Sequence, residues 1–111
     1  MGTKRTSQLA VSKRDREVVY ARDSFGYPPY PCCCTCGSPG RHDMSHYIKR
    51  SQGGKGIPEN LVNQCRECHN KMEHGLPHER EVLLSMVEEH LQSHYPGWSK
   101  EILTYKKEQI A

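Results

Sequence analysis

Two Cys-x-x-Cys pairs restrict the possible folds of this 111-residue chain more than any other feature of its sequence. The pairs are Cys33 with Cys36 and Cys65 with Cys68, and residues 37–64 lie between them. Two intervening residues allow both thiolates of a pair to reach one zinc ion at about 2.3 Å, while amides of the turn bond back to sulfur. The spacing therefore predicts one structural zinc ion held by four cysteines.

Two further cysteines, Cys32 and Cys34, adjoin the first pair. Cys32 with Cys36 is a looser alternative for the first half of the site, whereas Cys34 and Cys36 are too close in sequence to share one tetrahedral ion comfortably. Six cysteines would also fit the disulfide framework of a small secreted protein. The first twenty residues contain no apolar run typical of a signal peptide, and no segment is long enough to span a bilayer. We therefore expect a cytoplasmic protein with reduced thiols and a zinc ion.

The composition predicts a single small domain. Hydrophobic residues make up 34% of the chain and aromatic residues 7%, so a domain of this length needs a staple in addition to its core. The charges are unevenly distributed: residues 1–74 contain twelve Lys and Arg against seven Asp and Glu, whereas residues 75–111 contain four against six. A positive surface close to a metal site suits a polyanion such as nucleic acid, although an ordinary solvated surface can have the same composition.

The N-terminal part, residues 1–31, is expected to contain a basic arm, one helix and an extended segment. Ser12 is a suitable N-cap for a helix that runs to about Asp23. Prolines exclude a helix from residues 24–31. We expect the aromatic side chains of this segment to pack against the domain rather than to stack on bases; they are Phe25, Tyr27 and Tyr30.

The central part, residues 32–76, combines the cysteines with two short strands and a helix. The alternation of side chains over 41–49 predicts a strand that carries His46 on one face. A cationic, glycine-rich loop follows it, and the apolar residues 61–62 indicate a second strand. A helix is expected over 65–74, where the second cysteine pair begins it and a glycine ends it.

The C-terminal part, residues 77–111, is expected to be helical and to buttress the central part or to form a dimer interface. Its first half shows apolar residues at helical spacing, and its histidines His90 and His94 fit an ordinary helix surface. Residues 95–98, Tyr-Pro-Gly-Trp, interrupt this pattern. Ser99 could then cap a final helix that carries Ile102, Leu103 and Ile110.

Residues 32–75 contain a specific order of short motifs. They read Cys-x-x-Cys-Gly, a histidine inside a short strand, Arg-Ser-x-Gly-Gly, Glu-Asn-Leu-Val, Cys-x-x-Cys-His and one further histidine. This combination resembles the HNH endonuclease family, and most of all its compact members in phages and mobile elements. The resemblance implies an α+β protein with a small ββα-metal core, in which a β-hairpin and a helix bind one divalent ion. It also implies a structural zinc knuckle and flanking helices.

The resemblance also implies roles for four residues. His46 matches the general base that takes a proton from the water attacking phosphorus, a task that suits a neutral imidazole. Asn60 matches the asparagine whose amide orients the hairpin loop and so the base. His69 matches a ligand of the catalytic ion, and His74 stands where some members supply a second ligand. Mg²⁺ or Mn²⁺ is the expected ion, and a histidine-rich site also accepts Ni²⁺ or Zn²⁺.

The sequence departs from the family at Ser45, where members carry His or Asp as a further metal ligand. Asp43 lies two residues earlier on the strand face opposite to His46, about 7 Å from Ser45 along an extended chain, and could reach the ion if the strand bulges. Water is one alternative ligand, and His42 is another that agrees less well with the alternation. The basic residues around this strand and its loop are the candidate nucleic-acid contacts: Arg41, Lys49, Arg50 and Lys55.

Together these features predict a metal-dependent endonuclease that hydrolyses DNA phosphodiester bonds with low sequence specificity. It could be a nickase or a structure-specific enzyme, and we expect it in a bacterial or phage-infected cell. Low specificity follows because so short a chain leaves little room for a module that reads base edges. Two alternatives stay open: a non-catalytic, zinc-stapled nucleic-acid-binding module, and a zinc-stabilised protein-interaction adaptor. Both alternatives explain the cysteines but give no role to the histidines.

Overall fold

Helix α2 (Lys13–Arg22) is the first element of the part that this computed structural model describes, residues 10–105. Its N-cap is Ser12, whose hydroxyl accepts a hydrogen bond from the amide of Asp15 at 3.0 Å. Asp15 in the first turn and Arg22 in the last turn both complement the helix dipole. The predicted helix is thus confirmed, while the predicted basic arm falls mainly on residues 1–9, outside the described residues.

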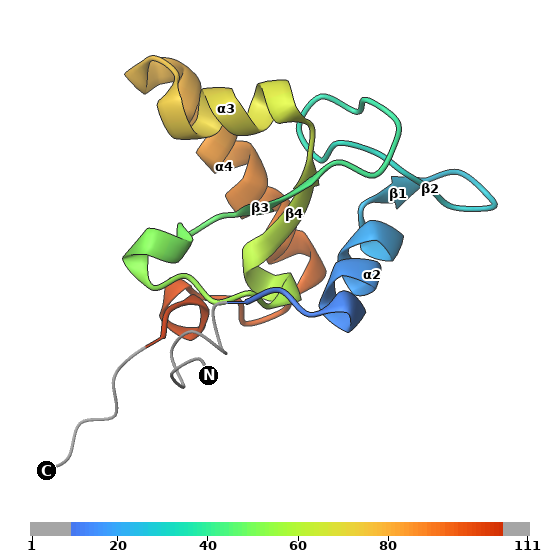
Figure 1. The fold of residues 1–111 in the computed structure, drawn as a ribbon, viewed down its shortest axis with the longest axis horizontal. Coiled ribbons are helices and arrows are strands. Elements are labelled where there is room, and N and C mark those ends of the chain that lie inside the picture. The colour runs from blue at the N-terminus through green and yellow to red at the C-terminus, as the bar shows by residue number, and fades with distance from the viewer. Residues whose placement is uncertain (1–9, 106–111) are drawn as a thin grey trace, which may run out of the picture.

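The proline-rich segment forms a small antiparallel hairpin of β1 (Ser24–Phe25) and β2 (Tyr30–Pro31), in which Phe25 stands opposite Tyr30. The prediction that its aromatic side chains pack against the domain is wrong, because Phe25 is 59% exposed, Tyr30 56% and Tyr27 99%. The reason lies in the topology: within the described chain the hairpin pairs only with itself, and it projects from the molecule beside α2 (Figure 1).

The centre of the molecule is a second antiparallel pair, β3 (Asp43–His46) and β4 (Leu61–Gln64), followed directly by helix α3 (Arg66–His74) (Figure 1). All four residues of β4 are buried. Strand β3 is shorter than predicted, because the Ile48 amide bonds to the side chain of Asn60 instead of a neighbouring strand. The predicted ββα unit is confirmed.

The loop between β3 and β4 contains two short 3-10 turns, η1 (Arg50–Gln52) and η2 (Pro58–Asn60). Between them, Gly54 packs against the preceding backbone so closely that a Cβ atom there would lie 1.7 Å from the carbonyl oxygen of Ile48. Any side chain at this position would therefore displace the backbone that follows β3.

Helix α4 (Pro77–His94) packs against α3 and completes the core. Its first turn is capped by Glu79, whose carboxylate accepts a hydrogen bond from the amide of Leu76 at 3.1 Å. The buried side chains of the main cluster come from β4, α3 and α4; they are Val62, Met72, Val87 and Leu91. In residues 10–105 no helix has the length and apolar character needed to cross a membrane.

The predicted final helix is wrong within the described residues. Only a 3-10 turn forms, η3 (Lys100–Leu103), and the Ser99 side chain makes no capping hydrogen bond to it. After this turn the chain becomes extended, and Thr104 pairs with Gly54 in an isolated antiparallel bridge. Tertiary pairing with the β3–β4 loop thus replaces a further helical turn, and Ile110 lies outside the described residues.

A buried polar network connects α2 to the other elements. The side chain of Asp23 is fully buried, and its Oδ1 lies 2.6 Å from Arg22 Nε and 2.7 Å from His90 Nε2. Its Oδ2 accepts hydrogen bonds from Arg22 Nη2 at 2.9 Å and from the amide of Asn63 at 2.8 Å. Arg22 donates in addition to two backbone carbonyl groups on either side of Asn60, those of Pro58 and Leu61.

Candidate functional site

The four predicted zinc ligands come together from two distant segments. Their sulfur atoms all lie within 4.8 Å of one another; the residues are Cys33, Cys36, Cys65 and Cys68. The sulfur atoms of Cys36 and Cys65 are 3.7 Å apart, and tetrahedral zinc with bonds of about 2.3 Å separates its sulfur ligands by about 3.8 Å. The cluster therefore fits one zinc ion.

Both cysteine turns are shaped by their local backbone. Gly37, directly after Cys36, has φ +79°, a left-handed conformation that lets the first turn close at little cost. The Cys36 amide lies 3.5 Å from Cys33 Sγ, and the Cys68 amide lies 3.5 Å from Cys65 Sγ. The second of these turns is also the start of α3, because Cys65 is its N-cap.

The pKa of the Cys33 thiol differs in direction from those of its neighbours Cys32 and Cys34. Burial raises the pKa of Cys33, but hydrogen bonds from the Thr35 hydroxyl and from backbone amides outweigh it and lower the pKa to about 6. Burial raises the pKa of Cys34 far above its ordinary value and also raises that of Cys32. The convergence of its sulfur atom on the other three ligands, together with this lower pKa, favours Cys33 over the looser alternative Cys32.

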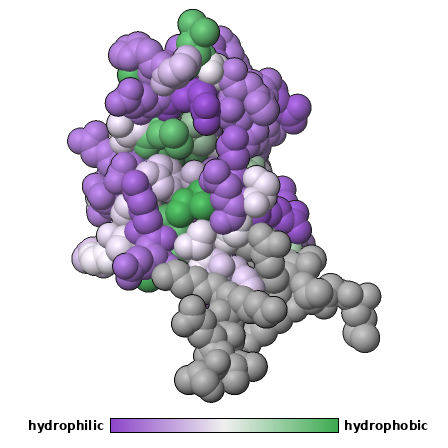
Figure 2. All heavy atoms as spheres, turned by 90° about the vertical axis from the view of Figure 1, so that its left-hand side faces the viewer, coloured by the Kyte–Doolittle hydropathy of each residue, from purple (hydrophilic) through white to green (hydrophobic). Residues whose placement is uncertain are grey.

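A cavity of about 230 Å³ lies beside the end of β3. His46 lines it together with Lys49, Gln52, Glu73 and Arg80. The green η1 turn and the gold connection from α3 to α4 both lie at the left of Figure 1, and Figure 2 shows this side as mainly hydrophilic with isolated hydrophobic side chains. An imidazole among cations and a carboxylate suits a charged substrate rather than an apolar one.

Asn60 closes the loop that follows His46. Its side chain is fully buried, and its Oδ1 accepts a hydrogen bond from the Ile48 amide at 2.8 Å. Its Nδ2 donates to the carbonyl groups of Ile48 at 3.1 Å and Lys55 at 2.9 Å. One side chain therefore holds both ends of this loop, two residues after His46.

His69 on α3 lies between two carboxylates. Its Nδ1 is 3.1 Å from Asp43 Oδ2 on β3, and its Nε2 is 3.2 Å from Glu73 Oε1 one helical turn further on. Asp43 also forms a two-point ion pair with Arg66 at 2.7 and 3.2 Å. Hydrogen bonds from Arg66 and then from His69 lower the pKa of Asp43, so this carboxyl group is ionised.

The predicted ligands of a second ion do not converge on one point. Asp43 and Glu73 approach opposite nitrogens of the His69 ring, and the 75% exposed side chain of His74 lies 3.6 Å from Glu73 Oε2. Ligand atoms of three or more His, Cys, Asp or Glu side chains converge at one place within residues 10–105, and that place is the four-cysteine cluster. An octahedral ion with bonds of about 2.1 Å separates adjacent ligands by about 3 Å. The 3.2 Å distance between His69 Nε2 and Glu73 Oε1 agrees with two adjacent ligands of such an ion.

Ser45, where the family would supply a ligand, is fully buried in β3. Among the described residues its hydroxyl has no hydrogen-bond partner. Strand alternation places it on the same face as Asp43, whose carboxylate contacts His69 of α3. A buried hydroxyl without a partner is costly, and a bound group on the α3 side would supply the missing partner.

Two charged residues of the cavity, Glu73 and Arg80, were not among the sequence candidates. Glu73 follows His69 by four residues on a helix, a spacing that places two side chains side by side. This spacing could have been found in the sequence. Arg80 lies in the first turns of α4 and donates to the Met72 carbonyl at 3.4 Å. Its place in the cavity depends on how α4 packs on α3, which no local pattern indicates.

The four predicted nucleic-acid contacts lie in two places. Lys49 lines the cavity, Arg50 is exposed on η1, and Lys55 is half-buried in the same loop. Arg41 lies instead against α2, where its guanidinium group makes a two-point ion pair with Glu17 at 3.0 and 3.2 Å.

These elements define a small α+β protein in which a four-cysteine knuckle supports a ββα unit with histidines on its strand and its helix. The family model described as HNH endonuclease matches residues 33–75, about two fifths of the chain. This match agrees with the resemblance inferred from the motif order. The family indicates a nuclease-type function. No curated protein and no solved structure matches the chain significantly.

Proposed function

We propose that the chain is a metal-dependent HNH endonuclease that hydrolyses DNA phosphodiester bonds with low sequence specificity. The observation that carries this proposal is the position of Glu73. It lines the cavity that contains His46, and its carboxylate lies 3.2 Å from His69 Nε2. The expected base on the hairpin and the expected metal ligand on α3 are thus linked through one acidic side chain.

His46 is the proposed general base. Its imidazole takes the proton from the water that attacks phosphorus, and Asn60 orients it by holding the loop that begins two residues later. The proposed ion ligands are His69 and Glu73, with Asp43 and His74 as further candidates. A divalent ion bound there would neutralise the phosphate and stabilise the leaving oxygen. The mixed nitrogen and oxygen ligands suit Mg²⁺ or Mn²⁺ and also accept Ni²⁺ or Zn²⁺.

Basic side chains of the cavity are the proposed phosphate contacts. Lys49 lines the cavity from the loop, and Arg80 lines it from α4. Arg50 and Lys55 extend this basic region along the loop. Because such contacts release counterions from DNA, binding should weaken steeply as the salt concentration rises.

Cleavage of supercoiled plasmid tests the proposal. Wild-type protein and His46→Ala are incubated with plasmid in Mg²⁺, Mn²⁺ or Ni²⁺, and His78→Ala, an exposed histidine on α4, serves as the matched control. We expect wild type and His78→Ala to relax or linearise the plasmid equally. His46→Ala should be about 100-fold slower or more, because general base catalysis contributes about that much. An intact plasmid in every metal, or equal cleavage by His46→Ala, would refute the proposal.

The non-catalytic alternative has one observation in its favour: Asp43, which could replace the ligand missing at Ser45, is already paired with Arg66. A zinc-stapled binding module would bind DNA and leave it intact in each of the three metals. Binding measured beside cleavage therefore separates the two functions. A protein-interaction adaptor would do neither.

A further inference from the structure

Three exposed aromatic side chains on the β1–β2 hairpin have no role in the core or in the candidate active site. They are Phe25, Tyr27 and Tyr30. The other aromatic residues of the described chain are buried or half-buried; they are Tyr20, Tyr47, Tyr95, Trp98 and Tyr105. Large apolar side chains that are exposed together mark a contact surface more often than isolated ones do.

The hairpin holds two of these rings, those of Phe25 and Tyr30, on one face before any partner binds. Phe25 and Tyr30 are direct cross-strand partners, so their side chains lie on the same face. The chain leaving β2 is anchored by the Cys32 amide, which donates to the Asp23 carbonyl at 2.9 Å, and Cys33 of the zinc cluster follows at once. A surface fixed between the buried network and the zinc knuckle loses little conformational freedom on binding.

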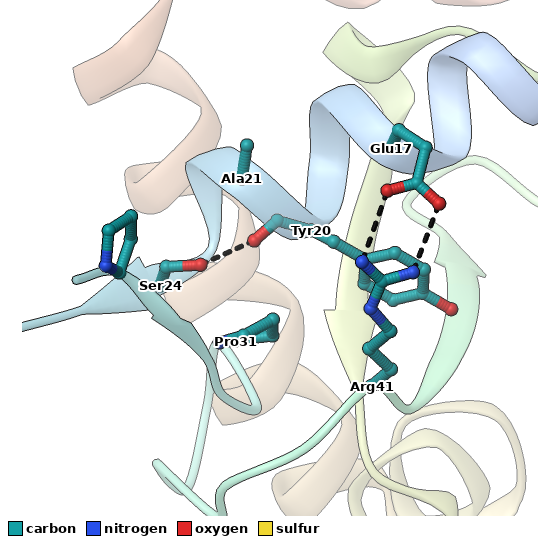
Figure 3. A pocket seen from close by; sticks show the side chains of 7 residues that line it. Glu17, Tyr20, Ala21, Ser24, Pro31 and Arg41 are labelled. Atoms are coloured by element: carbon teal, nitrogen blue, oxygen red, sulfur yellow. Dashed lines mark hydrogen bonds and ion pairs between the residues drawn. The ribbon is translucent and has the colours of Figure 1, made fainter.

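A cavity of about 210 Å³ lies between this hairpin and α2. Figure 3 shows the Arg41 guanidinium group between the carboxylate of Glu17 and the ring of Tyr20. The guanidinium carbon is 4.7 Å from the centre of that ring. Because Glu17 neutralises Arg41, the cavity suits a flat, neutral group better than a phosphate.

Two free cations continue the same face of α2. Lys13 and Arg16 are exposed, and they precede Tyr20 by seven and four residues, so helical spacing places the three on one stripe. Within the described residues neither has an ion pair within 4 Å. These cations are suited to phosphates beside the aromatic surface.

We propose that the face formed by the hairpin and α2 binds an unpaired stretch of DNA, with its bases stacked on the exposed rings and its phosphates at Lys13 and Arg16. Aromatic rings beside a cationic track are what single-strand binding requires, because every base offers a flat face. This inference rests on the proposed nuclease function for its choice of DNA. It assigns that function a substrate class: DNA with an unpaired segment next to the cleaved bond.

The cavity beside the hairpin, which Arg41 lines, is connected to the candidate active site by a short stretch of chain. Five residues of chain connect Arg41 to His46, which span at most about 18 Å. At a rise of 3.4 Å per base step, this corresponds to about five steps of duplex DNA. One DNA molecule that reaches the cavity beside Arg41 can therefore extend to His46.

Binding measurements with two oligonucleotides test the inference. His46→Ala protein is titrated with a blunt duplex and with the same duplex carrying an unpaired overhang, and fluorescence anisotropy reports binding. We expect tighter binding of the overhang. The triple variant Phe25→Ala, Tyr27→Ala, Tyr30→Ala in the same background should bind the overhang about 5- to 150-fold more weakly, and the duplex unchanged. A 2-aminopurine base in the overhang should change its fluorescence with the parent protein but not with the triple variant.

Two control variants separate stacking from folding. Tyr27→Phe with Tyr30→Phe keeps the rings and should keep the overhang preference, and Val82→Ala with Met86→Ala removes two exposed apolar side chains of α4 without effect. Unchanged overhang binding by the triple variant, or an equal loss for both oligonucleotides, would overturn the inference. Plasmid cleavage is measured separately, so a protein that prefers the overhang but never cuts would refute the proposed nuclease function alone.

Discussion

Replacing Asp23 with Asn should destabilise the protein by about 3–5 kcal/mol at neutral pH, although Asp23 lies outside the candidate site. The carboxylate is fully buried and is the common partner of Arg22, His90 and the Asn63 amide. An amide has the same shape but no charge, and its NH₂ group must face one of these donors. The Arg22 side chain, which is 8% exposed, would then be a buried cation without its counterion.

The lowered pKa of Asp23 agrees with an effect of this order. Burial alone would raise the pKa, but hydrogen bonds from His90 and Arg22, the Arg22 charge and the Asn63 amide lower it from 3.8 to about 2. A difference of about two units corresponds to about 2.5 kcal/mol in favour of the folded state. Because the folded-state pKa is the lower one, this stability is present above about pH 4 and is lost as the pH falls toward 2. The substitution costs more than protonation because the NH₂ group of Asn must in addition face one of the hydrogen-bond donors.

Urea unfolding at pH 7 of wild type, Asp23→Asn, Arg22→Met and the double variant measures this coupling. Asp15→Asn on the same helix is the matched control, and it should cost less than about 1 kcal/mol because it loses only a helix-dipole contact. We expect the double-mutant cycle to give a coupling of at least 2 kcal/mol between Arg22 and Asp23. An Asp23→Asn variant within 1 kcal/mol of wild type would refute the assignment of Asp23 as the centre of the network.

Three further predictions concern the zinc knuckle, the loop and the cavity. Cys65→Ser should lose zinc and helical structure, measured by metal analysis and circular dichroism, whereas Cys32→Ser should keep both; a folded, zinc-free Cys65→Ser would contradict the zinc assignment. Gly54→Ala should lower the free energy of unfolding in urea by about 3 kcal/mol or more, because its Cβ would lie 1.7 Å from a backbone atom. The control Gly97→Ala, where φ is +78° and the surrounding space is open, should lower it by about 1–2 kcal/mol. Equal losses would argue against this packing. Glu73→Gln should raise the metal concentration needed for plasmid cleavage about 10- to 100-fold with the fold intact, whereas Glu67→Gln on the same helix should not; an unchanged metal dependence would exclude Glu73 as a ligand.

The ββα unit and its zinc knuckle could be predicted because their signals are local. A two-residue spacer between cysteines in a reduced protein commonly indicates zinc binding. The side chains of the strand and of the helix each repeat with the period typical of that element. The same reasoning could have included Glu73, since it follows His69 by one helical turn. It was missed because the family resemblance directs attention to histidines, whereas chemistry allows a carboxylate at the same place.

The aromatic hairpin was predicted wrongly because composition does not determine which side chains are buried. A chain with few aromatic residues would gain stability by burying Phe25, Tyr27 and Tyr30. Burial nevertheless requires a second layer, and the β1–β2 hairpin pairs only with itself in the described chain. The core is therefore poor in aromatic residues partly because three of them are exposed on one hairpin. This exposure favours a role for these rings in binding.

The positioning of the candidate site depends on contacts that no local pattern reveals. His90 looked like an ordinary surface histidine, yet it bonds to Asp23, 67 residues earlier in the chain. Asp23 in turn binds the amide of Asn63 on β4, and Asn63 Oδ1 accepts a hydrogen bond from the amide of His42, directly before β3. The strand that ends in His46 is thus held from α4 and α2 through buried polar groups. Such groups are stable only when every partner is present, so a remote substitution in this network should disturb the position of His46 before it disrupts the four-cysteine cluster.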